Sequence, residues 1–195
     1  QTIAAFLGAI YAGCYYVPLD EEMPAHRIGL IFDTLRTEAV IYDETTREAL
    51  NALPYSGASY LYREISETPV AEDALAAIRE KQLDTDPIYI VFTSGSTGVP
   101  KGVVGCHRAV IDYIENLCPV LQPDETSVFG NQTPLYFDAF LKEVFPAFRY
   151  GGTVWLIPRQ LFMFPVKLVE FLNEYRINTV CWVVSALTMI SSFGT

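Results

Sequence analysis

The amino-acid sequence predicts an α/β protein in which strands and helices alternate around a mainly parallel sheet. About half of its 195 residues are hydrophobic (51%), which is enough to build a core. Residues 88–92 (IYIVF) are β-branched or aromatic throughout, as expected of a buried strand. Between such runs, apolar residues recur at helical spacing, for example Ile28, Ile31 and Leu35. This alternation is typical of a parallel sheet covered by helices.

The expected elements follow one another along the whole chain. We expect strands at 15–19, 38–42, 59–62, 88–92, 102–105, 127–129, 153–157 and 179–183. Helices or helical turns are expected at 1–13, 25–36, 45–50, 71–81, 109–117, 139–149, 166–175 and 185–192. The stretch 64–86 is richest in charge and poorest in apolar residues. It therefore predicts the boundary between a first subdomain, 1–80, and a second, 81–195.

Charge and cysteine usage exclude several classes of function. The 13 basic against 23 acidic residues give a net charge of -10, whereas nucleic acids and anionic membranes bind cationic surfaces. Neither is expected as a partner. The four cysteines form no CxxC pair and only two histidines are present, so we expect reduced thiols and no zinc-type metal site.

The two ends of the sequence and its hydropathy bear on location. No run of about 18 apolar residues occurs, and the first segment lacks the cationic start of a signal peptide. We therefore expect a cytoplasmic protein. The first residue is Gln1 and lies inside an expected helix, which indicates a piece of a longer protein.

The segment 93–102 (TSGSTGVPKG) is the most informative in the chain. Its glycines allow successive backbone N–H groups to converge on an anion, its hydroxyls add donors, and Lys101 adds a positive charge. These features suit a polyphosphate. The segment is not a Walker A loop, because Pro100 precedes Lys101 and a strand follows it. By composition alone, a polar surface loop between two strands is the commoner interpretation.

Three segments together resemble the adenylate-forming superfamily, which includes acyl-CoA synthetases, luciferases and the adenylation domains of nonribosomal peptide synthetases. The string TSGSTGVPKG looks like its phosphate-loop signature. Residues 13–20 (GCYYVPLD) and 136–140 (YFDAF) resemble two further segments of amino-acid adenylation domains, the second being the FDxS segment. The resemblance covers nearly the whole chain and implies part of the large N-terminal lobe.

The resemblance implies roles for particular residues. The β- and γ-phosphates of ATP would contact the phosphate loop, namely Thr93, Ser94, Gly95, Ser96, Thr97, Gly98 and Lys101. Asp138, beside Ala139, would pair with the α-ammonium group of an amino acid. The alternative for Asp138 is a helix N-cap. Phe140 stands where the family usually has Ser, which puts the local shape of the pocket in doubt.

Two further positions resemble the family's side-chain pocket. Lys142 would face it, although an exposed lysine or an i,i+4 ion pair with Asp138 is the commoner fate. Trp182 would line it, although a core aromatic is equally consistent with its apolar strand.

The resemblance also implies what lies beyond Thr195. The adenine and ribose segments and the catalytic lysine of the family have no counterpart in this sequence. No catalytic residue and no metal ligand are therefore assigned here. The complete enzyme would use ATP and Mg²⁺ to activate an amino acid or a small carboxylic acid, and would pass it to the phosphopantetheine thiol of a carrier protein. The alternatives are an acyl-CoA synthetase-like ligase for a non-amino acid, or a half-domain without catalysis of its own.

Overall fold

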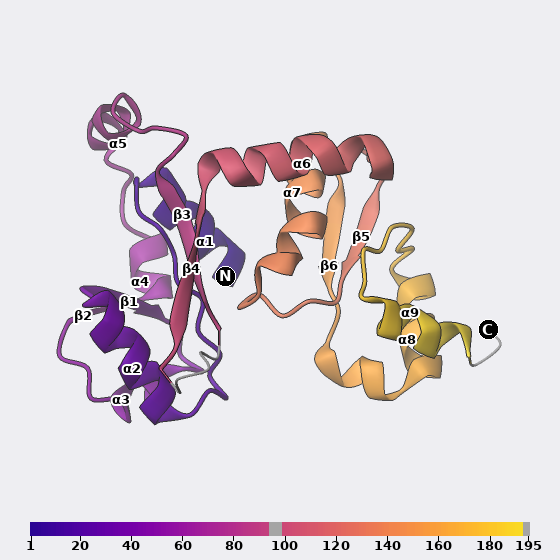
Figure 1. Ribbon diagram of the computed structural model, residues 1–195, viewed down its shortest axis with the longest axis horizontal. Helices are drawn as coiled ribbons and strands as arrows, with labels where there is room; N and C mark the ends of the chain where they lie inside the picture. Colours follow the sequence, from indigo (N-terminus) through magenta and orange to yellow (C-terminus); the bar gives the residue numbers. More distant parts are fainter. Residues whose placement is uncertain (94–98, 193–195) are drawn as a thin grey trace. The chain divides into compact units, whose positions relative to one another are not determined.

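The computed structural model describes residues 1–93 and 99–192 as alternating helices and short strands (Figure 1). By contacts the chain divides into two compact units, Gln1–Arg108 and Ala109–Thr195. The subdomain boundary expected at residue 80 stays a prediction for the complete enzyme. No helix of the described ranges is both long and apolar enough to span a membrane.

The first unit holds two strand pairs and most of the short helices. Its strands are β1 (Ala39–Tyr42), β2 (Ala58–Leu61), β3 (Pro87–Thr93) and β4 (Lys101–Cys106). Its helices are α1 (Thr2–Tyr11), α2 (Ala25–Leu35), α3 (Arg47–Asn51), α4 (Tyr62–Ser66) and α5 (Glu72–Arg79). β1 and β2 pair in parallel, whereas β3 and β4 form an antiparallel pair.

Helix α2 shows why the apolar spacing was informative. Ile28, Ile31 and Phe32 are buried at the i, i+3, i+4 spacing of one helix face. The helix begins after Pro24, and Arg36 ends it in the left-handed conformation with φ 51°.

The expected strand 15–19 is reduced to a single parallel bridge. Tyr16 accepts a hydrogen bond from the Ile90 N–H (3.0 Å) and donates one to the Ile88 carbonyl (3.1 Å). Pro18 follows two residues later and has no N–H to extend the ladder. Residues 15–19 are therefore extended without forming a regular strand in the described structure.

The second unit is built around a parallel strand pair. It contains β5 (Val128–Asn131), β6 (Thr153–Leu156), α7 (Leu141–Tyr150), α8 (Pro165–Glu174), α9 (Val184–Ser191) and most of α6 (His107–Leu121). Two 3-10 turns, η1 (Asp138–Phe140) and η2 (Arg159–Met163), precede α7 and α8. α7 packs on both strands (Figure 1), and Gly151, with φ 74°, ends it.

The expected strand 179–183 is also shortened. Thr179 pairs with β5, since its N–H donates to the Val128 carbonyl (3.1 Å) and its carbonyl accepts from the Gly130 N–H (3.0 Å). Beyond Thr179, the backbone ladder is not continued in the described structure. Side chains take over the hydrogen bonds there, as described below.

Candidate functional site

The two described ends of the expected phosphate loop lie side by side at the tip of the β3–β4 hairpin. Thr93 ends β3, Lys101 begins β4, and the two are register partners. The Thr93 hydroxyl donates a hydrogen bond of 3.4 Å to the Lys101 carbonyl. Both residues are exposed, so the Lys101 ammonium group is available to an anion at this tip, and the Thr93 hydroxyl becomes available when it turns from the Lys101 carbonyl.

The middle of that loop comprises five residues. Ser94, Gly95, Ser96, Thr97 and Gly98 lie outside the described residues. Their expected contacts with phosphates stay predictions. The antiparallel pairing of β3 and β4 confirms that a strand follows the expected phosphate loop, whereas a helix follows a Walker A loop.

Asp138 lies in the second unit, at the first residue of the turn η1. Neither η1 nor α7 has a side-chain cap hydrogen bond, and their N-cap positions are Phe137 and Phe140. The helix-cap interpretation of Asp138 is therefore wrong in this structure. Asp138 is exposed and Ala139 half-buried, so this carboxylate is available to an external cation.

A polar cluster forms where α6, η1, α7 and the segment after Thr179 come together. Burial raises the pKa of the half-exposed Tyr113 hydroxyl, and Cys181, Asp138 and Glu143 raise it further through their negative charge. Burial likewise raises the pKa of the Cys181 thiol, with Glu143 adding to the effect and Lys142 opposing it. Each member of this polar cluster therefore interacts electrostatically with at least one other member. The members are Tyr113, Asp138, Lys142, Glu143 and Cys181.

Glu143 is the most buried member of this cluster, with an exposed fraction of 0%. Its carboxylate accepts hydrogen bonds from the Asn131 side-chain amide (2.6 Å) and from the Cys181 backbone N–H (3.0 Å). Burial raises the pKa of the Glu143 carboxyl, while these hydrogen bonds act in the opposite direction. Glu143 was not expected from the sequence, although its place on the apolar face of α7 is a detectable signal.

Lys142 differs from both of the commoner outcomes expected for it, which were exposure to solvent and an ion pair with Asp138. It is half-buried rather than exposed, and the ion pairs within the described residues do not include one with Asp138. Its charge acts on Cys181 and Glu143 instead. A role toward a substrate side chain stays a prediction.

Trp182 lies in the core. It is buried with Ile157, Leu168 and Ala186, and its ring meets the Phe162 ring edge-on at a centroid distance of 5.2 Å. Its indole N–H donates a hydrogen bond to the Gly130 carbonyl. This packing favours the core alternative for Trp182, and its substrate role stays a prediction. Cys181, one residue earlier, is the member of this segment that reaches the polar cluster.

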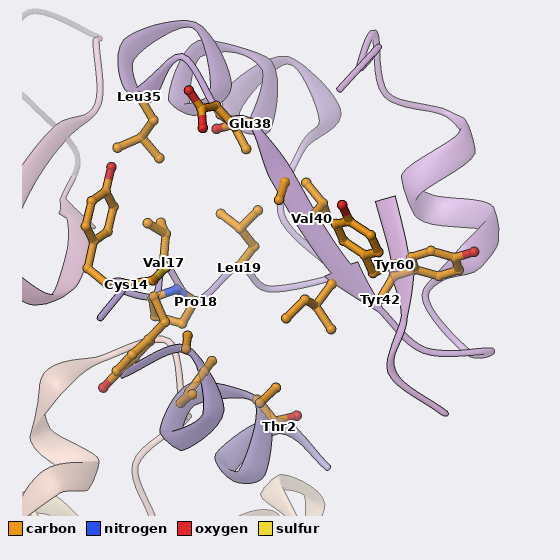
Figure 2. A pocket seen from close by; sticks show the side chains of 18 of the residues that line it. Thr2, Cys14, Val17, Pro18, Leu19, Leu35, Glu38, Val40, Tyr42 and Tyr60 are labelled. Carbon is orange, nitrogen blue, oxygen red and sulfur yellow. The ribbon is translucent and has the colours of Figure 1, made fainter. Parts of the chain in front are cut away.

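A groove of about 990 Å³ opens in the first unit between α1, the extended residues 13–19, the end of α2 and β1. Figure 2 shows Leu19, Leu35 and Val40 converging on it from three segments. None of the site residues expected from the sequence lines this groove. It therefore adds no candidate to the ATP or acid site.

The described residues contain no group of three or more His, Cys, Asp and Glu side chains placed to hold a metal ion. Asp138 and Glu143 belong to the polar cluster described above, and Glu143 is already engaged by two donors. We therefore assign no Mg²⁺ ligand among the described residues.

Comparison with known proteins places the chain in a family. The profile of the AMP-binding enzyme family matches residues 1–194. A D-alanine--D-alanyl carrier protein ligase of Staphylococcus aureus (strain bovine RF122 / ET3-1) is 33% identical over 178 residues, which are 90% of this chain and 35% of that protein. The chain thus spans about a third of the length of the curated relatives it matches.

Solved structures agree with this match. A four-domain nonribosomal peptide synthetase bound to AMP and glycine is 27% identical, with a TM-score of 0.78 over 97% of this chain and 14% of that one. A synthetase bound to α-methyl-L-serine-AMP, 24% identical, shares the fold with a TM-score of 0.83 over 99% of this chain and 21% of that one. The chain belongs to the AMP-binding enzyme family.

Proposed function

We propose that the chain is the phosphate-loop and acid-binding part of an amino-acid adenylation enzyme. The observation that carries the amino-acid assignment is the carboxylate of Asp138, which is exposed and caps no helix. A substrate ammonium group needs such a partner when it leaves water. The D-alanyl carrier protein ligase relative and the glycine-bound synthetase support the same assignment.

The proposed reaction has two steps. A carboxylate oxygen of the substrate attacks the α-phosphorus of ATP, and the bond from that phosphorus to the β-phosphate oxygen breaks, which releases pyrophosphate. The thiol of a phosphopantetheine arm on a carrier protein then attacks the acyl carbon, loses its proton, and AMP leaves. Hydrogen-bond donors and positive charge that offset charge on the phosphates would speed the first step.

Thr93 and Lys101 are the described residues that would serve the phosphates. Their hydroxyl and ammonium groups stand at one hairpin tip, and residues 94–98 between them would add backbone N–H groups. Mg²⁺ would be held by groups elsewhere in the complete enzyme. The catalytic lysine would also lie outside this chain, and the enzyme would act in the cytoplasm.

The second candidate is a ligase for a carboxylic acid without an amino group. A fatty acyl-adenylate ligase from L. pneumophila shares the fold, with a TM-score of 0.71 and 18% identity over 92% of this chain and 32% of that one. Such a substrate offers Asp138 no cation. A third candidate is a half-domain that binds neither substrate by itself.

Matched acids test the proposal in the complete enzyme. We would measure the acid-dependent exchange of pyrophosphate into ATP with alanine and propanoate, with serine and glycerate, and with aspartate and succinate. Each pair compares an amino acid with an analogue that lacks the ammonium group. The proposal predicts that one of the amino acids supports exchange at a rate at least tenfold higher than its analogue without the ammonium group. Equal or better exchange with the analogue would favour the second candidate.

A further inference from the structure

Helix α7 buries a carboxylate within its apolar face. Phe140, Glu143, Val144 and Ala147 follow the i, i+3, i+4, i+7 spacing of one face, and all four are buried. A carboxylate at such a position lowers stability unless donors surround it. The groups that donate hydrogen bonds to Glu143 therefore indicate the structural role of this residue.

Asn131 and Cys181, which donate to Glu143, lie where the backbone hydrogen bonds between β5 and the segment after Thr179 end. Thr179 pairs with Val128 and Gly130 of β5 through two backbone hydrogen bonds. In a continued parallel ladder, the next bond would run from the Cys181 N–H to the Gly130 carbonyl. The indole N–H of Trp182 occupies that carbonyl instead, at 2.7 Å, so the Cys181 N–H needs another acceptor.

Glu143 supplies that acceptor. One carboxylate oxygen accepts from the Cys181 N–H at 3.0 Å, and the other accepts from the side-chain amide of Asn131 at 2.6 Å. The Gln132 backbone also lowers the pKa of this carboxyl, as the smallest of the effects on it. A single side chain of α7 thereby joins the end of β5 to the segment that carries Cys181.

Glu143 and the Cys181 segment that it holds both belong to the polar cluster. Cys181 and Asp138 both act on the Tyr113 hydroxyl, and Lys142 acts on Cys181. Asp138 begins the turn that leads directly into α7. Since Glu143 lies on α7 and holds the Cys181 backbone, it relates the position of Cys181 to that of Asp138.

We propose that Glu143 is a positioning residue for the acid-binding site, which it serves by fixing the Cys181 backbone against α7. This inference rests on the proposed adenylation function. The residue acts through hydrogen-bond acceptance rather than through contact with substrate. A side chain of the same shape that still accepts a hydrogen bond should therefore preserve its role.

Two substitutions separate hydrogen bonding from packing. Glu143→Gln keeps an oxygen for the Cys181 N–H, and its amide can face the Asn131 oxygen once that side chain turns over. Glu143→Met has similar length and flexibility but presents no comparable acceptor. Asn131→Ala is a third, milder variant, because it leaves the Cys181 N–H its acceptor but removes one of the two hydrogen bonds that orient the Glu143 carboxylate.

Steady-state exchange kinetics in the complete enzyme provide the first test. Glu143→Gln should keep the KM for the acid within about threefold of wild type. Glu143→Met should raise it by about 10- to 100-fold, because a misplacement of about 1 Å in a site can cost about 10²-fold, with the KM for ATP within about twofold. Equal changes in both KM values, or unchanged KM values with less folded protein, would show a purely structural role and overturn the proposal.

Hydrogen exchange of the Cys181 amide provides a test that does not depend on activity. Its exchange in the complete enzyme should speed up at least tenfold in Glu143→Met and stay within about threefold in Glu143→Gln. If the wild-type enzyme activates no amino acid, the proposed function fails on that result alone. Unchanged amide exchange in Glu143→Met would overturn the positioning role. If Glu143→Met does not fold, Asn131→Ala replaces it: the less firmly oriented carboxylate should speed exchange of the Cys181 amide by at least threefold, and unchanged exchange would overturn the role.

Discussion

The indole N–H of Trp182 donates a hydrogen bond of 2.7 Å to the backbone carbonyl of Gly130. Both residues are buried, so this bond satisfies a carbonyl of β5 that water does not reach. The same ring packs in the cluster of Ile157, Leu168 and Ala186. Trp182 therefore serves the core of the second unit through both its apolar surface and its one polar atom.

Replacement of Trp182 by Phe should destabilise the protein. The substitution leaves the Gly130 carbonyl without its donor and reduces the packed volume, so the free energy of unfolding should fall by about 1–3 kcal/mol. Trp155→Phe is the matched control, because Trp155 on β6 is 37% exposed. Urea unfolding of both variants measures the difference. A change in acid specificity with no loss of stability would instead support a pocket role for Trp182.

The sequence predicted most elements because their signals were local. The apolar face of α2, the buried run of β3 and the end of α7, expected at residue 149 and found at Tyr150, all appear close to where they were expected. The strands at 15–19 and 179–183 were overestimated, since pairing also depends on what the neighbouring backbone offers. Pro18 interrupts the first ladder, and the Trp182 indole N–H, which donates to the Gly130 carbonyl, interrupts the second.

The candidate site was predictable only in part, for a related reason. Resemblance identified Asp138 and the loop at 93–102, but the partners of a buried side chain come from distant segments. Glu143 meets residues 12 and 38 positions away along the chain, and Tyr113 reaches the cluster from another helix. No periodicity within α7 or α6 reveals such contacts.

Gly13 is expected to be intolerant of a side chain. It has φ 72°, and a Cβ built on it would lie 2.5 Å from Cγ2 of Ile78. Gly13→Ala should therefore lower the free energy of unfolding by about 1–2 kcal/mol. Gly8→Ala within α1 is the control, because a Cβ there meets nothing within 4 Å and should stabilise the helix by about 0.5–1 kcal/mol. Equal urea midpoints for the two variants would contradict this expectation.

The stability of wild type relative to Glu143→Gln should depend on pH. Burial raises the pKa of the Glu143 carboxyl above that of an unfolded glutamate, about 4.3. The folded state therefore binds the proton more tightly, and wild type loses stability as pH rises from about 4.3 through the folded pKa. Glutamine has no such loss.

Unfolding free energies of the two proteins between pH 3.5 and pH 7 measure this dependence. The difference should move in favour of Glu143→Gln as pH increases. Asp43, Asp84 and Asp124 have lowered pKa values in both proteins, so their contributions cancel in the comparison. A pH-independent difference would show that Glu143 has no shifted pKa in the folded state.

The 195-residue chain alone should not catalyse amino-acid-dependent exchange of pyrophosphate into ATP. The adenine, ribose and catalytic-lysine segments expected from the family have no counterpart in its sequence. The complete enzyme, assayed beside it at equal concentration, provides the positive control. Exchange by the isolated chain above the rate without amino acid would show that the essential groups lie within residues 1–195.

Asp138→Ala in the complete enzyme should raise the KM for the amino acid strongly and the KM for ATP little. The lost partner is the ammonium group, whereas the phosphates are expected at residues 93–102. Asp138 is exposed in the unliganded chain, and a bound amino acid would shield its carboxylate from water. Removal of one member of a charge pair that is shielded in this way costs about 3–5 kcal/mol, so kcat/KM for the amino acid should fall about 10²-fold or more.

Asp138→Asn separates charge from shape at the same position. Since neither η1 nor α7 has a side-chain cap bond, both substitutions should leave the thermal midpoint within about 1–2 °C of wild type, as is usual for an exposed position. Asparagine keeps the size and polarity of the side chain but cannot offset an ammonium charge, so it should be nearly as inactive as alanine toward the amino acid. Full activity of Asp138→Asn, with matched kinetics for alanine and propanoate, would instead assign the enzyme to acids without an amino group.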